Sequence, residues 1–152
     1  MSKNKNFLIF SIAILAAIAA VVGSLWYNAR FFFDESLYVE KDSYEYNLLI
    51  SDSIKDMPVH KPITDTVRYH YGAGDGNKPQ SDSLEYETHE PRESVLEFYR
   101  QYLVSQGYVL LQPESNSEEN IIYGNSREDF NVYVRALQGK NEVIVYHQQI
   151  YE

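Results

Sequence analysis

The longest uncharged stretch of the chain, Phe7 to Tyr27, constrains its fold more than any other feature. Its 21 residues, FLIFSIAILAAIAAVVGSLWY, contain no charged side chain and interrupt the apolar run only at Ser11, Gly23 and Ser24. As a helix rising about 1.5 Å per residue, the stretch would be about 31 Å long, close to the ~30 Å hydrocarbon core of a bilayer. The sequence therefore predicts a single transmembrane helix at 7–27.

The residues that flank this stretch predict its orientation. Lys3 and Lys5 precede it, whereas Arg30 on the far side is soon followed by Asp34. Basic residues favour the cytoplasmic side of a membrane. We therefore expect residues 1–6 to form a cytoplasmic tail, and the C-terminal part to lie outside a bacterial inner or plasma membrane.

A cleaved signal peptide is the alternative interpretation of the same stretch. Ala17-Ile18-Ala19 resembles a cleavage site that follows a basic N-terminal region and an apolar run. Cleavage after Ala19 would leave a mature chain beginning AVVGSLWY, an apolar end without a burial partner. The sequence therefore favours a retained signal anchor.

Small residues recur along the stretch and predict close packing against another helix. Small side chains let two helix backbones approach each other within a membrane. The candidates for this helix-helix contact are Ala13, Ala16, Ala17, Ala20 and Ser24. A simple alanine-rich anchor without a partner would show the same pattern, so the contact is a hypothesis.

The rest of the chain is acidic and lacks cysteine. All 22 Asp and Glu residues follow the apolar stretch, against 13 minus 2, or 11, of the Lys and Arg residues. This excess of negative charge argues against nucleic acid and anionic surfaces as partners. The lack of cysteine excludes disulfides, thiolate metal ligands and a cysteine nucleophile.

The chain beyond the apolar stretch is predicted to form a stalk followed by one domain. Residues 28–56 are assigned to a membrane-proximal stalk, and residues 57–152 to an extracytoplasmic domain. Pro58 and Pro62 impose extended or turning backbone near its start.

Side-chain periodicity predicts an antiparallel sheet covered by one helix. Alternation of apolar and polar residues indicates strands at 67–71, 84–88, 108–112, 121–123, 131–137 and 142–150. Helical spacing indicates a helix from Pro91 to Gln106, which Gly107 would end in a left-handed conformation, with Tyr108 packing back on Leu103. The expected fold class is α+β: a single N-terminal transmembrane helix and a ββαββββ-like sheet of the helix-grip type.

Three short motifs carry a resemblance to a known type of domain. They are Tyr86-Glu87-Thr88, the run ESVLEFY that ends at Tyr99, and Gln106-Gly107-Tyr108. This order resembles a recurring bacterial envelope domain with a YxT strand, a VxxFY helix, a glycine-aromatic stop and three antiparallel strands. The resemblance covers residues 57–151 and implies the fold rather than an activity. Its layout is also similar to the helix-grip domains of outer-membrane assembly lipoproteins.

The chain has no motif that is typical of catalysis or of metal binding. Its histidines lack metal-ligand spacing, although His70 and His147 were candidates to meet across the sheet, and no serine stands in a G-x-S-x-G context. We therefore expect no catalytic residue, no metal ligand and no cofactor. Candidates for an aromatic interaction surface are Tyr69, Tyr71, Tyr133 and Tyr146.

These observations favour a non-catalytic, membrane-anchored envelope protein. Its domain would bind another envelope or membrane protein, as an accessory subunit of a membrane complex. A sensor or carrier module for a small ligand is the alternative, and a hydrolase is a third hypothesis.

Overall fold

The computed structural model describes residues 3–29, 36–74, 79–112 and 120–150. Within the first of these ranges, the side chains of residues 3–9, 11 and 28 lie outside the description. The chain divides into two compact units, Met1–Glu35 and Ser36–Glu152.

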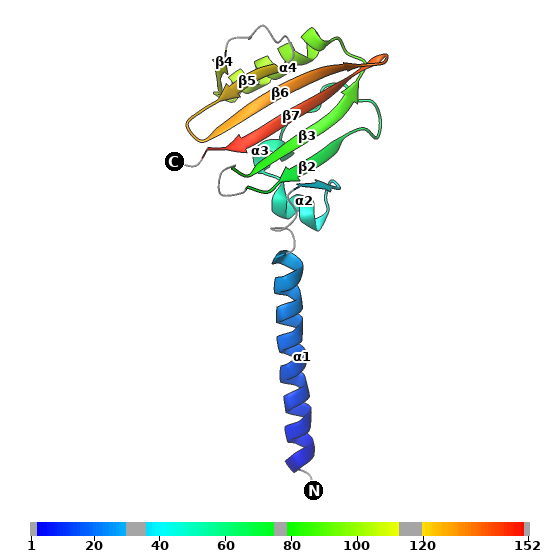
Figure 1. Ribbon diagram of the computed structural model, residues 1–152, viewed down its shortest axis with the longest axis vertical. Coiled ribbons are helices and arrows are strands. Elements are labelled where there is room, and N and C mark those ends of the chain that lie inside the picture. The colour runs from blue at the N-terminus through cyan, green and yellow to red at the C-terminus, as the bar shows by residue number, and fades with distance from the viewer. Residues whose placement is uncertain (1–2, 30–35, 75–78, 113–119, 151–152) are drawn as a thin grey trace. The chain divides into compact units, whose positions relative to one another are not determined.

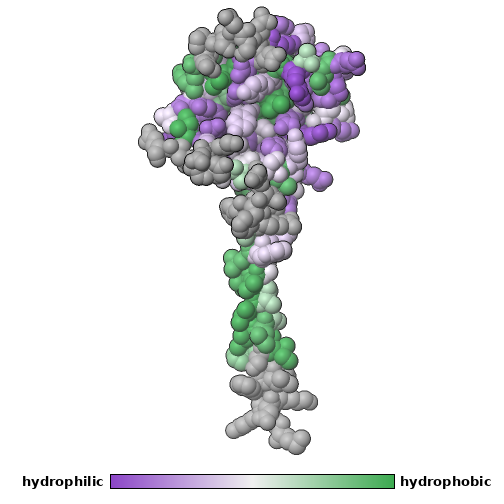
Figure 2. Space-filling view, viewed as in Figure 1, coloured by the Kyte–Doolittle hydropathy of each residue, from purple (hydrophilic) through white to green (hydrophobic). Residues whose placement is uncertain are grey.

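The first unit contains a single helix. Helix α1 spans Lys3–Ala29 and includes the whole apolar stretch, in which the strong helix formers alanine and leucine recur. Its described apolar side chains are exposed, as the hydrophobic surface along this helix in Figure 2 shows. The small residues proposed for helix packing, Ala13, Ala16, Ala17, Ala20 and Ser24, are also exposed. Their packing against another helix stays a prediction.

The predicted transmembrane helix at 7–27 is corrected. Among the residues that the structure describes, no helix combines the length and the apolar character needed to cross a membrane. By this finding the assignments of a signal anchor and of an inner or plasma membrane location are wrong.

The second unit is built on one seven-stranded antiparallel sheet (Figure 1). The strand order is β1-β2-β3-β7-β6-β5-β4. The strands are β1 (Ser36–Val39), β2 (Arg68–Gly72), β3 (Ser81–Thr88), β4 (Val109–Gln112), β5 (Asn120–Gly124), β6 (Glu128–Leu137) and β7 (Lys140–Gln149). The pairing of β3 with β7 joins the two halves and places the C-terminal strand in the middle. Six strands lie where the alternation predicts them, and β1 is additional.

One face of the sheet forms the core. Along β3, the side chains of Leu84, Tyr86 and Thr88 are almost completely buried. Leu84 lies opposite Val145, and Tyr86 lies opposite Val143, on the neighbouring strand β7. Because side chains alternate between the two faces of a strand, this register assembles an apolar layer from the even-numbered positions of β3 and the odd-numbered positions of β7.

Two helices lie on this buried face, behind the sheet in Figure 1. The short helix α3 (Asp52–Lys55) contacts β3, and α4 (Arg92–Ser105) contacts β5 and β6. Helix α4 buries Val95, Tyr99 and Leu103, which are spaced by four residues and therefore lie on one side of the helix. The single helix predicted at 91–106 is present, and α3 is a second covering element.

The segment assigned to a stalk, 28–56, instead belongs largely to the folded unit. It contributes β1, the helix α2 (Tyr44–Leu49) and α3. Ser43 and Ser51 cap these two helices, each accepting a hydrogen bond from the backbone N–H three residues later, at 3.0 and 3.2 Å. Ile54 of α3 is completely buried. This segment therefore packs as part of the core.

The fold class is corrected accordingly. The structure shows a seven-stranded antiparallel sheet with helices on one face, and not the combination of a transmembrane helix with a smaller sheet and one helix. The helix-packed antiparallel sheet follows from the alternating strands, whereas β1, α2 and α3 are too short to give a clear period.

The C-terminal end of α4 has the predicted geometry. Gly107 adopts a left-handed conformation with a φ of 88°. Its N–H donates to the carbonyl of Val104 at 3.0 Å, and the N–H of Tyr108 donates to the carbonyl of Leu103 at 3.0 Å. These two bonds define a Schellman ending. The ending turns the chain so that Tyr108 follows directly beside the helix.

We predict that Gly107→Ala lowers the free energy of unfolding by about 1–2 kcal/mol, because an L side chain is strained at this φ. A Cβ at this position would meet no atom within 4 Å, so strain rather than a clash causes the loss. Chemical denaturation of both proteins measures the difference. Val104→Ala, at an exposed position of the same helix, is the control and should change the free energy by less than about 0.5 kcal/mol. Equal stability of Gly107→Ala and the parent protein would contradict the assignment.

Candidate functional site

Two acidic residues and one histidine belong to the buried, mainly apolar face of the sheet. Asp82 of β3 is 4% exposed and His147 of β7 is 1% exposed. The two residues lie directly opposite each other in the register. Glu128 of β6 lies two residues before the buried Phe130, and its side chain is 20% exposed. Buried charges are costly unless they are paired, so the contacts among these three residues decide whether this face is stable.

The imidazole ring of His147 lies between the two carboxylates. Its Nδ1 is 2.6 Å from Oδ1 of Asp82, and its Nε2 is 2.8 Å from Oε2 of Glu128. Burial by itself would lower the pKa of His147, but the hydrogen bonds and charges of Asp82 and Glu128 outweigh it and raise the pKa above its usual value. The geometry therefore fits an imidazolium that donates from both ring nitrogens.

The same cluster fastens α3 and the end of α4 to the sheet. The N–H of Ser51, at the start of α3, donates to Oδ2 of Asp82 at 2.6 Å. The hydroxyl of Ser53 donates to Oε2 of Glu128 at 3.0 Å, and the hydroxyl of Tyr108 donates to Oε1 of Glu128 at 2.5 Å. Burial alone would raise the pKa of Glu128, but these donors and His147 lower it overall.

The contact between Ser51, His147 and Asp82 does not form a nucleophilic triad. The hydroxyl of Ser51 lies 3.2 Å from Nδ1 of His147, the same nitrogen that contacts Asp82. In a serine nucleophile triad the serine and the acid contact different ring nitrogens. Here Glu128 contacts the other nitrogen, and the hydroxyl of Ser51 accepts the N–H that caps α3. The arrangement is suited to holding α3 in place rather than to proton transfer from a serine.

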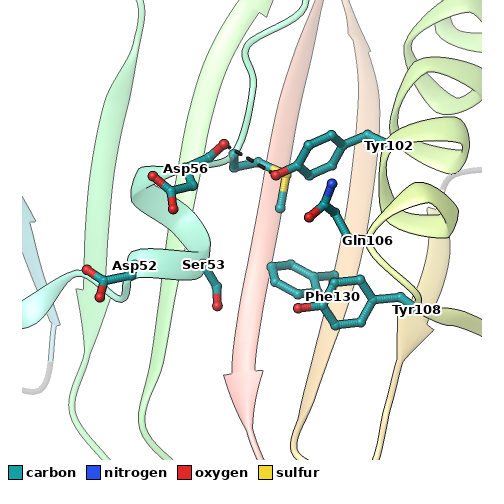
Figure 3. A pocket seen from close by; sticks show the side chains of 8 residues that line it. Asp52, Ser53, Asp56, Tyr102, Gln106, Tyr108 and Phe130 are labelled. Carbon is teal, nitrogen blue, oxygen red and sulfur yellow. Dashed lines mark hydrogen bonds between the residues drawn. The ribbon is translucent and has the colours of Figure 1, made fainter.

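A groove lies beside this cluster, between α3 and the end of α4. It has a volume of about 240 Å³. Figure 3 shows α3 on one side, the side chains from the end of α4 on the other, and the strands behind. The groove is lined by Asp52, Ser53, Asp56, Met57, Tyr102, Gln106, Tyr108 and Phe130.

Aromatic rings form the side of the groove that faces α3. The rings of Tyr108 and Phe130 meet edge to face, with centroids 5.0 Å apart at 74°. The hydroxyl of Tyr102 donates to the backbone carbonyl of Asp56 at 3.3 Å and bridges the two sides, as the dashed line in Figure 3 shows. Burial and the charge of Glu128 raise the pKa of Tyr108, so its hydroxyl stays protonated and donating at neutral pH.

The four tyrosines proposed as one interaction surface lie on two faces of the sheet. Tyr69 and Tyr71 are buried, at 5% and 4% exposure, on the face covered by the helices. Tyr133 is 41% exposed, and it lies with Tyr146 at the opposite parity, facing away from the helices. The structure therefore does not bring the four together. An interaction through Tyr133 and Tyr146 stays a prediction.

The histidine pair considered for a metal is also split between the faces. His147 lies opposite Asp82 on the buried face, whereas His70 lies opposite Ser83, whose side chain points the other way. His70 instead contacts the hydroxyl of Ser36 at 2.7 Å. Within the described ranges, no group of three or more His, Cys, Asp or Glu residues is placed to hold a metal ion.

The sequence pointed to His147 only as a candidate metal ligand, and neither its partners Asp82 and Glu128 nor the groove was predicted. A signal for the cluster existed, because strand parity applies to polar residues as well as to apolar ones. Asp82 lies two residues before Leu84, and His147 lies two residues after Val145. Side chains two residues apart in a strand lie on the same face, so both are expected on the buried face. No comparable signal existed for the groove, because one of its sides is the four-residue helix α3, which is too short to show helical periodicity.

Comparison with known proteins gives one match. A protein-family model described as START domain-like matches residues 65–142, which is 78 of the 152 residues and therefore just over half of the chain. The matched segment includes Tyr102, Tyr108 and Phe130 of the groove but not α3. Neither the curated proteins nor the solved structures gave a match. The resemblance to a bacterial envelope domain stays a prediction.

We predict that the cluster makes stability depend on pH. The pKa of His147 is raised in the folded protein, so its contribution is complete below the unfolded value of about 6.5 and is lost as the pH rises through the folded pKa. The pKa of Glu128 is lowered, so its contribution is complete above about 4.5 and is lost as the pH falls through the folded pKa. The free energy of unfolding in urea should therefore decrease as the pH rises above about 6.5.

His147→Gln should remove most of this decrease and cost about 3–5 kcal/mol near pH 6, because it leaves buried carboxylates without their partner. His89→Gln is the matched control, since His89 contacts the carbonyl of Gly139 away from the cluster, and it should keep the parental pH profile. Parallel pH profiles for the parent protein and His147→Gln would show that the cluster does not carry the dependence.

Proposed function

The chain belongs to the START domain-like family, and on that premise we propose that its second unit is a non-catalytic binding module for a small ligand. This proposal corresponds to the alternative hypothesis from the sequence, a sensor or carrier module for a small ligand. The groove between α3 and the end of α4 is the observation that carries the proposal.

The groove has the composition that is typical of ligand sites. Such sites combine apolar and aromatic walls with a few polar groups that orient the ligand. Here Met57 and Phe130 are buried at 4% and 1% exposure, whereas Ser53 and Gln106 present polar groups. The volume of about 240 Å³ lies below the roughly 300–1,000 Å³ of pockets for drug-sized ligands. The proposed ligand is therefore small.

The walls of the groove are held in place before any ligand binds. The hydroxyls of Ser53 and Tyr108 both donate to Glu128, from the two sides of the groove. The hydroxyl of Tyr102 holds the end of α3. A preformed site loses less conformational entropy on binding than a flexible one. This supports binding without requiring a chemical step.

Met57 offers a direct test of ligand binding. The chain contains two methionines, Met1 and Met57, so selective ¹³C-methyl labelling yields one signal from the groove and one reference signal. We predict that small aromatic compounds, screened as separate cationic, neutral and anionic pools, shift the Met57 signal and leave that of Met1 unchanged.

Gln106→Trp should abolish this shift, because the larger side chain occupies the groove. Gln101→Trp is the matched control at an exposed position of the same helix that does not line the groove, and it should bind as the parent protein does. If no pool of any charge shifted the Met57 signal, the proposed function would be wrong.

A further inference from the structure

The charges around the groove restrict the ligand further. Among its eight lining residues, two carry a negative charge, Asp52 and Asp56, and none is Lys, Arg or His. Glu128 adds a third carboxylate directly behind the hydroxyls of Ser53 and Tyr108. The formal charges on the residues that line the groove are therefore all negative, and an anionic ligand would meet repulsion.

The positively charged side chains described near the groove do not cancel its negative charge. His147 lies between Asp82 and Glu128, so the buried cluster sets one imidazolium against two carboxylates. Lys55 pairs with Asp52 at 3.4 Å and also donates to the carbonyl of Asn47. In the part of the chain that the structure describes, no ion pair engages the carboxylate of Asp56. An excess of negative charge remains at the rim next to α3.

The opposite wall adds a second attraction for cations. The rings of Tyr102 and Tyr108 line the groove, and the faces of aromatic rings attract cations. Phe130 is 1% exposed and supports the ring of Tyr108 from the sheet. The hydroxyl of Tyr102 donates to the backbone carbonyl of Asp56, and that of Tyr108 donates to the carboxylate of Glu128, so neither points into the groove. The groove thus offers aromatic carbon to the apolar part of a ligand and negative charge to its head group.

We propose that the groove binds a small organic cation, an amine or ammonium compound that carries one aromatic or alkyl group. The apolar group lies against Tyr102 and Tyr108, and the ammonium group lies on the side of the groove next to α3. This assignment rests on the proposed function, because it names the ligand class of the same groove. It excludes phosphate and carboxylate ligands, for which the groove offers no cationic side chain.

Three probes of nearly equal size separate charge from shape. They are 2-phenylethylammonium, the neutral 2-phenylethanol and the anionic phenylacetate, each titrated against the full chain with the Met57 methyl signal as readout. We expect the cation to bind about tenfold more tightly than the alcohol, and phenylacetate to give no shift. Added salt should weaken binding of the cation and leave that of the alcohol unchanged.

Asp56→Asn tests the carboxylate at the rim. It should weaken binding of the cation about three- to fivefold and leave that of 2-phenylethanol unchanged. Asp65→Asn, the same substitution at an exposed position that does not line the groove, should change neither. Circular dichroism and the unchanged affinity for the alcohol would show that the variant is folded.

The outcomes separate the two proposals. Equal affinities for the cation and the alcohol, or tighter binding of phenylacetate, would overturn the cation assignment and leave ligand binding intact. Unchanged affinity of Asp56→Asn for the cation would overturn the role of that carboxylate and with it the stated orientation. The absence of any Met57 shift with all three probes would reject both the cation assignment and the proposed function.

Discussion

The position of His147 between Asp82 and Glu128 is the interaction on which the second unit depends. These residues come from β7, β3 and β6, so their contacts join three strands of the sheet. Each carboxylate also accepts a donor from the segment around α3: the N–H of Ser51 reaches Asp82, and the hydroxyl of Ser53 reaches Glu128. A four-residue helix cannot be stable by itself, and this cluster explains how α3 keeps its place.

The cluster contributes position more than it contributes net stability. Buried ion pairs gain little over well-packed apolar residues, because removing the charges from water is costly. Removing one member, however, leaves the others buried without a partner. Glu128 also accepts the hydroxyl of Tyr108, which follows the Schellman ending of α4. One carboxylate thereby connects the two sides of the groove.

Much of the second unit follows from periodicity in the sequence. Alternation predicts the central strands, and helical spacing together with Gly107 predicts α4 and its ending, because each of these elements is long enough to show its period. The elements β1, α2 and α3 are too short to show a period, and for this reason the sequence predicts a stalk in the segment that contains them. Parity along β3 and β7 would have placed Asp82 and His147 in the core, since strand geometry takes no account of polarity.

The apolar stretch shows a different limit. Composition and length predicted a transmembrane helix at 7–27, and α1 does form there, yet the described residues include no helix able to cross a membrane.

The protonation state of His147 tests the central claim most directly. In a ¹⁵N spectrum of the histidine side chains near neutral pH, both ring nitrogens of His147 should appear protonated, because one donates to Asp82 and the other to Glu128. A cross-peak between the Nδ1 proton of His147 and the N–H proton of Ser51, which both contact Asp82, would show that the protonated ring lies beside the start of α3. A neutral ring, with one nitrogen unprotonated under these conditions, would contradict the account.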